Sequence, residues 1–444
     1  MALADLRERI ERREVTIGVI GLGYVGLPVA CIFAEAGFRV VGVDLKADRV
    51  AKISAGYCPI EGKEPGLADL LAKVVGEGRL RATTHYADLA AADVVTINVE
   101  TPVDEEHRPD YTALMAACRS LGPVLQEGAL VVVESTVAPG TIDRVVRPLL
   151  EEVTSRREGT GFFLGVCPER VMPGKLLANL RTMSRVCGGS TPEVAETMAA
   201  LYRQVVRADI DLTDCLTAEL VKTVENAYRD VQIAFANEMA LLCEDLGADV
   251  WRVRELVNKV PHRDMHLPGP GVGGHCIPKD PWLLIANASP SFPARLTRAA
   301  RAVNDAMPQH VAELVVTGLR KAGRDIKGAK VAVLGYAYLE DSDDTRNSPS
   351  EPLVAALRAA GAEVLIHDPF VAAYALDWKE TVQGADAVVV MVAHSAYRVI
   401  DLAKLSALLR TPVVVDARHV LCSSKAQGFA RLGVGQASQE RCSQ

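Results

Sequence analysis

A glycine-rich turn near the N-terminus constrains the fold of this chain more than any other feature. The turn, Gly21–Gly26 (GLGYVG), follows the β-branched run Val15–Ile20 and leads through an apolar segment to a second run, Phe38–Val43. This order predicts a strand, a tight turn, a helix and a parallel strand. The first two glycines permit a tight turn and close backbone approach to a pyrophosphate, and the third lets helix and strand pack. The sequence therefore predicts a dinucleotide-binding unit.

A carboxylate stands where the second predicted strand ends. Asp44 follows Gly26 by eighteen residues. An acidic side chain at this place accepts hydrogen bonds from the adenosine ribose and repels a 2′-phosphate, which favours NAD over NADP as cofactor. Two further runs, Asp93–Val99 and Leu130–Glu134, are almost continuously apolar, as is typical of strands buried on both faces of a parallel sheet.

The strand pattern recurs in the last third of the chain. The matching runs are Lys330–Gly335, Glu363–Asp368, Ala385–Val392 and Pro412–Asp416. The first turn of this repeat, Gly335-Tyr336-Ala337-Tyr338, lacks the second and third glycines, so we expect no dinucleotide to bind there in the same manner. A related ligand such as a nucleotide sugar is one interpretation, and a sheet kept for packing or dimerisation is the other. The predicted fold class is α/β, with two Rossmann-like doubly wound parallel-sheet domains.

A helical segment separates the two halves. Between Thr217 and Lys259 the apolar residues follow helical periodicity, which predicts one long helix joining the domains. These residues are Leu220, Val221, Val224, Ala227, Tyr228, Val231, Ala234 and Phe235. We place the domains at about 1–210, 211–310 and 311–444. The tail after Val420 is mostly polar, so we expect no clear strand there and interpret Cys422 and Cys442 as incidental surface thiols.

Composition excludes several protein classes. A chain of 444 residues, 49% hydrophobic and 24% charged, is typical of a globular protein of two or three domains. The net charge of −7 provides no broad basic surface for nucleic acid or an anionic membrane. The N-terminus lacks the apolar core of a secretion signal and no apolar run could span a bilayer, so we expect a cytoplasmic protein. The ten cysteines form no CxxC pair and no zinc-type cluster, so we expect no metal site.

The segment Leu267–Asp280 (LPGPGVGGHCIPKD) carries the strongest chemical signal. Its four glycines and three prolines are incompatible with a core helix or strand. Cys276 follows two glycines and precedes two charged residues, which favours a reactive thiol over a buried one. His275 is a weaker candidate, for a general base. A second signal, Lys222 with Asn226, lies on one face of the predicted helix, and its spacing alone fits either a site or a solvated pair.

Six ordered motifs resemble the UDP-glucose/GDP-mannose dehydrogenase family over nearly the whole chain. They are GLGYVGLP at 21–28, ESTVAPGT at 134–141, CPERVMPG at 167–174, KTVENAYRDVQIAFANE at 222–238, GVGGHCIPKDPW at 271–282 and DDTRNSP at 343–349. The most similar branch oxidises 2-acetamido sugars. The resemblance implies a UDP-N-acetyl-hexosamine substrate, oxidation of its C6 alcohol to a carboxylate by two NAD in succession, and a homodimer. Residues 229–238 look more like the branch for the manno sugar, and the gluco epimer is the alternative.

Oxidation beyond the aldehyde explains the need for a thiol. An aldehyde has no readily removed hydride until a nucleophile adds to its carbonyl. The resemblance implies that Cys276 supplies this nucleophile, so that a thiohemiacetal is oxidised to a thioester, which water hydrolyses. A non-catalytic sensor of NAD or nucleotide sugars is the alternative from another class, and the joint presence of Cys276, Lys222 and Asp280 argues against it.

The resemblance also implies roles for individual residues. Lys222 exchanges a proton at the C6 oxygen, Asn226 positions it, and Asp280 supports water or the lysine. Glu169 assists thioester hydrolysis, and Thr136 holds a water or the nicotinamide. The implied NAD contacts are Gly21, Gly23, Tyr24, Val25, Gly26, Asp44, Arg49, Thr101, Thr136 and Arg346. The implied substrate contacts are Glu169, Arg170, Val171, Lys222, Asn226, His262, Arg263, Gly273, Tyr338, Leu339, Arg346 and Arg418.

Three positions carry a further implication: Arg263, Leu339 and Glu100. Arginines suit phosphate recognition because their guanidinium groups bind anions in a bidentate manner. By resemblance, Arg263 reaches the site of a neighbouring subunit. Leu339 stands where many relatives have a lysine, which removes one cationic contact. Glu100, before Thr101, also departs from the neutral residue often found there.

Overall fold

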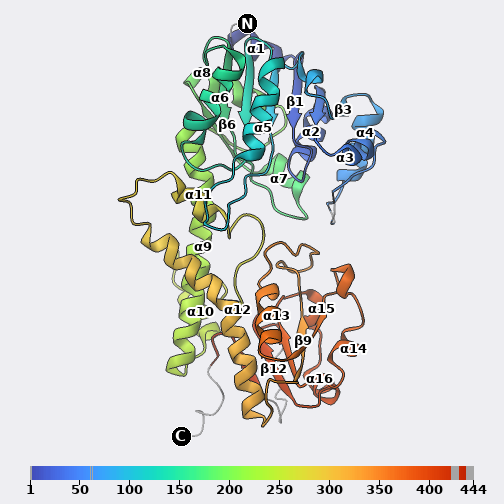
Figure 1. Ribbon diagram of the computed structural model, residues 1–444, viewed down its shortest axis with the longest axis vertical. Coiled ribbons are helices and arrows are strands. Elements are labelled where there is room, and N and C mark those ends of the chain that lie inside the picture. The colour runs from blue at the N-terminus through green and yellow to red at the C-terminus, as the bar shows by residue number, and fades with distance from the viewer. Residues whose placement is uncertain (1–2, 61, 63, 422–429, 437–444) are drawn as a thin grey trace. The chain divides into compact units, whose positions relative to one another are not determined.

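The protein consists of two compact α/β units (Figure 1). A computed structural model describes residues 3–60, 62, 64–421 and 430–436. Unit 1 comprises Met1–Glu225 and Trp282–Ser291, and unit 2 comprises Asn226–Pro281 and Phe292–Gln444. Each unit contains one sheet with helices on both faces, and long helices lie in the central part of the sequence. The predicted fold class is confirmed.

Unit 1 contains an eight-stranded sheet in the order β3-β2-β1-β4-β5-β6-β7-β8. The strands are β1 (Thr16–Ile20), β2 (Arg39–Val43), β3 (Leu80–Thr83), β4 (Val94–Ile97), β5 (Ala129–Val133), β6 (Phe162–Val166), β7 (Arg185–Gly189) and β8 (Ile210–Asp214). Strands β1 to β6 are parallel, and β1, β4, β5 and β6 are buried almost throughout because their residues are apolar on both faces. Strand β7 runs antiparallel to β6, and β8 is parallel to β7.

Helices cover both faces of this sheet. One apolar core includes residues of α1 (Leu3–Glu11), α2 (Gly26–Glu35), α3 (Ala47–Ser54), α4 (Leu67–Gly76), α7 (Leu176–Thr182) and α8 (Pro192–Tyr202). The core on the other face includes residues of α5 (Thr112–Leu121), α6 (Arg147–Thr154) and the short helices η1 (Tyr86–Leu89) and η3 (Ile142–Val146). The short helix η2 (Gly122–Val124) follows α5. Helix α2 is buried along nearly its whole length because its sequence is apolar on every side.

Unit 2 contains a five-stranded parallel sheet in the order β10-β9-β11-β12-β13. The strands are β9 (Lys330–Leu334), β10 (Glu363–His367), β11 (Ala387–Val390), β12 (Val413–Asp416) and β13 (Ala430–Gly433). One core includes residues of α12 (Arg295–Lys321) and α13 (Ser350–Ala359), and the other includes residues of α14 (Trp378–Val382), α15 (Ser395–Arg398) and α16 (Leu402–Leu408). The short helix η4 (Ala372–Tyr374) follows β10.

Strand β13 corrects one prediction. The tail was expected to hold no strand, yet its residues pair in parallel with β12, with Val413 opposite Ala430. Pairing with an ordered neighbour places this strand, and Leu432 is its main apolar side chain in the core. A polar sequence can therefore form an edge strand without an apolar run. Cys422 and Cys442 lie outside the described residues.

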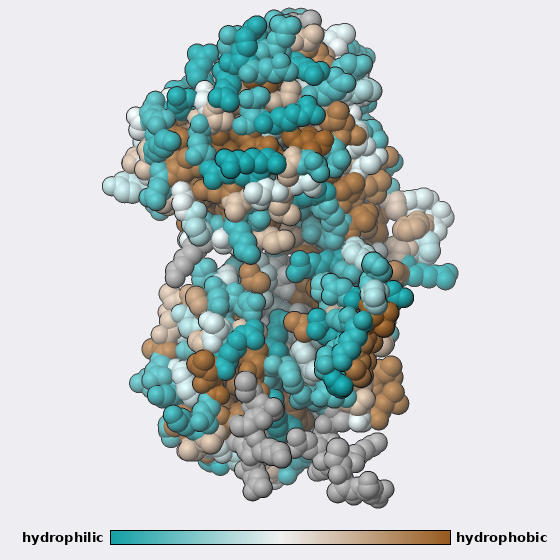
Figure 2. Space-filling model, turned by 180° about the vertical axis from the view of Figure 1, so that it is seen from behind, coloured by the Kyte–Doolittle hydropathy of each residue, from teal (hydrophilic) through white to brown (hydrophobic). Residues whose placement is uncertain are grey.

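Helix α9 (Cys215–Leu246) is the predicted long helix, and α10 (Val250–Val257) and α11 (Asp280–Ala286) follow it. Part of its predicted apolar stripe is buried, but four large side chains are exposed: Leu220, Val224, Tyr228 and Phe235. Elsewhere the molecular surface is mixed, with hydrophilic side chains over much of the face shown in Figure 2 and apolar ones between them. No helix in the described part of the chain is both long and apolar enough to span a membrane.

Candidate active site

The glycine turn is closed where the chain packs on itself and open at its second glycine. Gly21 has a left-handed φ of +88°. A Cβ on Gly26 would lie 1.9 Å from the Gly21 carbonyl oxygen, so only glycine fits there. Where a Cβ of Gly23 would stand, in contrast, no atom of a described residue lies within 4 Å. The turn thus provides the close backbone approach that a pyrophosphate needs at the start of α2.

Asp44 closes the turn from the end of β2. Its carboxylate accepts hydrogen bonds from the backbone N–H groups of Leu22 (2.9 Å) and Lys46 (2.9 Å). Arg49 donates to the same carboxylate at 2.9 Å. The two residues predicted to contact the adenosine side of NAD therefore lie together beside the glycine turn.

Tyr24 links the glycine turn to two distant segments. Its hydroxyl donates a hydrogen bond to Glu64, whose carboxylate also accepts the backbone N–H groups of Gly174 (2.7 Å) and Leu176 (3.2 Å). The neighbouring Val25 packs against the core of unit 1. Glu64 thereby joins the turn to the end of CPERVMPG and to the start of α7.

The loops after β4 and β5 are also joined. The Thr101 hydroxyl donates to the Thr136 carbonyl oxygen, and the Ser135 hydroxyl donates to the Val99 carbonyl oxygen at 2.6 Å. Both loops lie at the carboxyl ends of parallel strands, where open α/β sheets bind their ligands. Thr101 and Thr136, two predicted cofactor contacts, are therefore brought together.

Glu169 belongs to a buried cluster of charges. Its Oε2 lies 2.5 Å from Nη1 of Arg185, whose Nη1 is also 3.9 Å from Oε1 of Glu134. Glu134 accepts hydrogen bonds from Tyr202 (2.7 Å) and from Asn98 (2.7 Å), and Tyr202 presents its ring to the guanidinium at 4.9 Å. The cluster thus holds two carboxylates and one arginine away from water.

Burial and charge shift the pKa values in this cluster. Burial raises the pKa of Glu134 because it disfavours the ionised carboxylate, although Arg185 opposes this effect. Burial is the largest single influence on the pKa of Arg185 and by itself lowers it, but Glu169, Cys167, Tyr202 and Glu134 together outweigh burial, and the pKa is raised. Arg185 is therefore a permanent cation in the interior of unit 1.

Arg170 follows Glu169 and is held by its own partners. Its guanidinium donates to Glu225 on α9 through Nε (3.1 Å) and to the Ser184 carbonyl oxygen (2.9 Å). Val171, the next predicted substrate contact, packs against the apolar core. Lys222 is partly buried on the same helix as Glu225.

Asn226, one helical turn after Lys222, pairs with the start of α11. Its Nδ2 donates to Oδ2 of Asp280 at 2.5 Å, and Asp280 is 1% exposed. The Lys279 ammonium lies 3.0 Å from Oδ1 of the same carboxylate. Asp280 is therefore a buried acceptor shared by an amide and a cation.

The thiol loop packs closely on the segment after β9. A Cβ on Gly273 would lie 2.5 Å from Cβ of Tyr338, and one on Gly274, whose φ is +89°, would lie 2.8 Å from the Tyr338 ring. Asn347 donates to the Gly274 carbonyl oxygen at 3.1 Å. These contacts require glycine, and they leave the Cys276 thiol exposed. Cys276 is thus exposed and not buried, while its reactivity stays a prediction.

The other predicted substrate residues of unit 2 differ in their surroundings. Arg346 pairs with Asp344 at 2.6 Å, and Leu339 is 37% exposed. Arg418 donates to the Met391 carbonyl oxygen at 3.1 Å, and burial lowers its pKa to about 10. A desolvated cation of this kind gains stability when an anion binds beside it.

His262 and Arg263 lie in the exposed segment after α10. His262 has a left-handed φ of +64°. The Arg263 guanidinium is 3.5 Å from the carbonyl oxygen of His262. Neither side chain is buried, in contrast to Asp280 and Glu169.

Asp368 of unit 2 occupies the place at the end of β10 that Asp44 occupies at the end of β2. Its carboxylate accepts hydrogen bonds from the backbone N–H groups of Tyr336 (2.7 Å) and Ala337 (2.9 Å) and contacts His394 Nε2 at 3.0 Å. Burial tends to raise its pKa, but these hydrogen bonds hold the pKa at about 2. The carboxylate is fully buried, so it is closed to a ribose.

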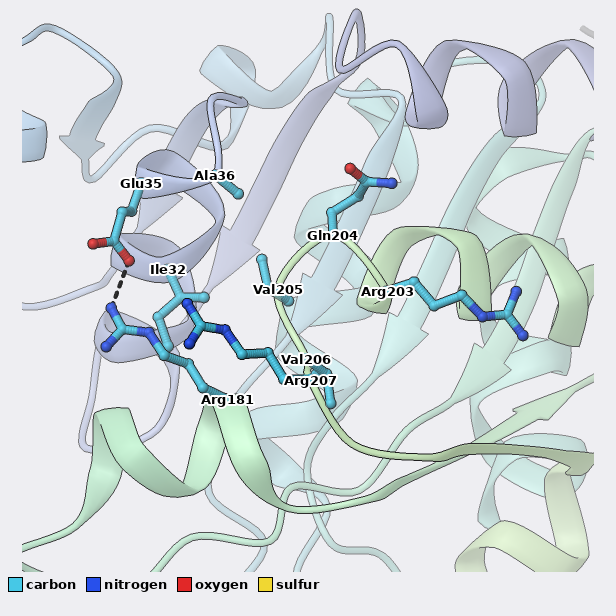
Figure 3. A pocket seen from close by; sticks show the side chains of 9 residues that line it. All are labelled: Ile32, Glu35, Ala36, Arg181, Arg203, Gln204, Val205, Val206 and Arg207. Carbon is cyan, nitrogen blue, oxygen red and sulfur yellow. Dashed lines mark hydrogen bonds and ion pairs between the residues drawn. The ribbon is translucent and has the colours of Figure 1, made fainter.

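A hollow of about 390 Å³ lies between α2, α7 and the loop after α8 (Figure 3). Arg181 pairs there with Glu35 at 2.5 Å, Arg207 lies beside Arg181, and Arg203 points away from them. Glu35 is nine residues beyond Gly26 on α2, or about 13.5 Å at 1.5 Å per residue. The hollow is therefore separate from the glycine turn.

Sequence reasoning missed several of these partners. Glu64 and Arg185 contact the predicted site residues Tyr24 and Glu169, and Tyr202 contacts Arg185, although all three lie outside the recognised motifs. Lys279 lies within the motif GVGGHCIPKDPW, but no role was predicted for it. Glu134 did open a recognised motif, ESTVAPGT, and its acidic side chain directly after an apolar strand was the one available signal.

The chain belongs to the UDP-glucose/GDP-mannose dehydrogenase family. Residues 15–206 match its NAD binding domain, 216–306 its central domain and 332–423 its UDP binding domain. The predicted family and its cofactor, NAD, are confirmed. A second nucleotide-binding domain, also predicted, corresponds to the match with the UDP binding domain.

Individual relatives resemble the chain over almost its full length. It is 40% identical to UDP-N-acetyl-D-mannosamine dehydrogenase of Pyrococcus horikoshii over 94% of this chain and 99% of that protein. A solved structure of UDP-D-ManNAc dehydrogenase from P. horikoshii superposes with a TM-score of 0.90, covering 95% of this chain and 100% of the other. NDP-N-acetyl-D-galactosaminuronic acid dehydrogenase of Ralstonia nicotianae is 37% identical over 91% of this chain and 95% of its own.

Proposed function

We propose that this protein oxidises UDP-N-acetyl-D-mannosamine at C6 to the uronate, with two NAD per sugar. The observation that carries the proposal is the exposed Cys276 thiol at the end of a glycine loop that packs against Tyr338. Family membership and the named relatives support the substrate class. The thiol supports the second oxidation, which an alcohol dehydrogenase without a nucleophile does not perform.

The proposed reaction balances in three steps. The C6 alcohol loses a hydride and a proton to give the aldehyde. The Cys276 thiol adds to the aldehyde carbonyl, and the thiohemiacetal loses a second hydride and proton to become a thioester. Water then adds to the thioester carbonyl, the C–S bond breaks, and the acid and the free thiol are released. Overall, one alcohol, one water and two NAD⁺ give one carboxylate, two NADH and three protons.

The chain's own residues have proposed roles at each step. Lys222 takes and returns the proton at the C6 oxygen, and Asn226, fixed by Asp280, orients that oxygen. Glu169 accepts a proton from the hydrolytic water, and Thr136 holds that water or the nicotinamide. The glycine turn and Asp44 would hold NAD, which would supply the hydride acceptor for both oxidations.

The proposed diphosphate contacts are the arginines of unit 2. Arg418 is the best placed by its chemistry, because burial destabilises its cation and an anion would relieve that cost. Arg346 and Tyr338 flank the same glycine loop, through Gly274. Arg263 would complete the site of a neighbouring subunit.

We also propose that the protein is a cytoplasmic homodimer. Exposed apolar side chains line α9, including Tyr228 at 62% and Phe235 at 55%, and a second copy would cover them. A reducing compartment would keep the exposed Cys276 thiol available for catalysis.

The decisive experiment measures how many NADH form per sugar oxidised. UDP-N-acetyl-D-mannosamine is incubated with excess NAD, and NADH is counted by absorbance while the sugar product is identified by mass spectrometry. We expect two NADH and one uronate per sugar, and C276S should form no acid while still binding both ligands. One NADH with accumulated aldehyde would overturn the mechanism, and faster turnover of the N-acetyl-glucosamine epimer would overturn the substrate assignment.

A further inference from the structure

Glu169 lies three residues after β6, and Arg185 is the first residue of the neighbouring antiparallel strand β7. Strands β6 and β7 pair Gly165 with Gly189 and Val166 with Gly188. Beyond these pairs the backbones part: the N–H of Glu169 donates to the Glu134 carbonyl oxygen at 3.3 Å, and the N–H of Arg185 donates to the Asp209 carbonyl oxygen at 3.0 Å. The two side chains nevertheless form an ion pair of 2.5 Å. The ion pair, and not backbone pairing, therefore joins the arginine to the carboxylate.

Arg185 is itself held from several sides. The guanidinium lies between Glu169 and Glu134 and beside the Tyr202 ring, and its side chain is only 5% exposed. Glu134 is anchored in turn by hydrogen bonds from Tyr202 and Asn98. The guanidinium thus has little freedom to move and is shielded from water.

The two carboxylate oxygens of Glu169 differ in their hydrogen bonds. Oε1 accepts the backbone N–H of Arg170 at 2.8 Å. Oε2 is buried and accepts no hydrogen bond from the described residues, because the nearby Arg185 N–H groups are not aligned with it. The arginine therefore holds Oε2 by charge and leaves its lone pairs for another donor. A water molecule is such a donor.

We propose that Arg185 is a positioning residue, which fixes the Glu169 carboxylate so that Oε2 accepts a proton from the water that hydrolyses the Cys276 thioester. This inference rests on the proposed function. The water oxygen bonds to the thioester carbon, one water proton passes to Glu169, and the C–S bond breaks with its electron pair on sulfur. The sulfur is then reprotonated to the thiol. Arg185 acts only through Glu169 and undergoes no chemical change.

The charge state of the cluster matters for the test. The titratable and charged groups around the pair are Glu134, Cys167, Arg170, Cys187 and Tyr202. Replacing Arg185 by methionine removes the guanidinium that contacts both buried carboxylates. The ionised form of Glu169 is then less favoured, so hydrolysis should require a higher pH.

The test combines intact-protein mass spectrometry with steady-state rates across pH. We expect R185M to form NADH in the first turnover, to accumulate the sugar acyl adduct on Cys276, and to turn over about 10²-fold more slowly. The acid side of its rate profile should move up by about one pH unit or more. R185K keeps the charge and should restore the profile in part.

Two controls separate positioning from stability. R185M/E134Q carries the same net charge in the cluster as the wild type, so it should fold even if R185M does not, and it should still accumulate the adduct. R9M removes an arginine from another buried carboxylate of unit 1, Asp93 at 2.9 Å, and should lower thermal stability without adduct or pH shift.

The variant E169Q distinguishes the two levels of the proposal. If E169Q accumulates the adduct but neither Arg185 variant does and their pH profiles match the wild type, the positioning role is refuted and the proposed function stands. If E169Q itself forms no adduct, the hydrolytic role of Glu169 fails and the proposed mechanism fails with it.

Discussion

A buried glutamate should make unit 1 less stable as the pH rises. Glu219 on α9 accepts the backbone N–H groups of Gly140 (2.6 Å) and Ile142 (2.8 Å), and it is 1% exposed. Burial raises its pKa from 4.5 to about 7. The folded state therefore favours the protonated carboxyl. Stability from this group is fully present below pH 4.5 and is lost as the pH rises through 7.

The size of the effect follows from the two pKa values. Linkage gives a cost of ionising Glu219 of about 1 kcal/mol at pH 5 and about 3 kcal/mol at pH 8. Relative to E219Q, whose amide does not titrate, the wild type should lose about 2 kcal/mol of stability between these pH values. The glutamine leaves one N–H poorly paired, which lowers stability by a similar amount at both pH values and cancels in the comparison.

Hydrogen exchange measures this difference locally. Exchange of the amides of Gly140 and Ile142 is followed by mass spectrometry at pH 5 and pH 8, corrected for intrinsic rates, and converted to a free energy of opening. The free energy of opening of the wild type should fall more steeply between pH 5 and pH 8 than that of E219Q. Parallel pH dependence in the two proteins would refute the burial argument.

Three further predictions test the sites. G26A should disrupt the turn, because its Cβ would lie 1.9 Å from the Gly21 carbonyl oxygen, whereas G23A should fold normally and lose NAD affinity at least tenfold. The melting temperature and an NAD titration distinguish the two variants, and equal stability of the two would contradict the geometry. R418A should raise KM for the UDP-sugar about tenfold or more with little change in the KM for NAD, and an unchanged sugar KM would remove this arginine from the diphosphate site. Y228E should convert the proposed dimer to a monomer in light scattering, and a mass equal to that of the wild type would contradict the proposed interface on α9.

The buried strands were predictable because their physics is local. Runs such as Leu130–Glu134 are apolar on both faces, which is typical of a central strand of a parallel sheet. The predicted run matches the bounds of β5 within one residue at each end. Strands β7 and β8 have no such signal. Strand β8 alternates with polar, exposed residues at the edge of the sheet, and β7 ends in two glycines, so their pairing depends on tertiary contacts.

The site divides along the same line. Asp44 was predictable because its distance from the glycine turn is fixed by one strand, one helix and a second strand. The cluster of Glu134, Glu169, Arg185 and Tyr202 was not, because its members follow β5 and β6, begin β7 and end α8. Long-range folding brings them together, and no spacing along the chain encodes that meeting.

Each Rossmann-like domain has an aspartate after its second strand, but the two aspartates have different surroundings. Both carboxylates accept two backbone N–H groups, but Asp44 is 7% exposed and pairs with Arg49, whereas Asp368 is fully buried and contacts His394. Adding glycines to the second turn would therefore not be enough to make it a dinucleotide site. Asp368 would first have to release the backbone N–H groups of Tyr336 and Ala337. The loop would then lose the hydrogen bonds that fix its conformation.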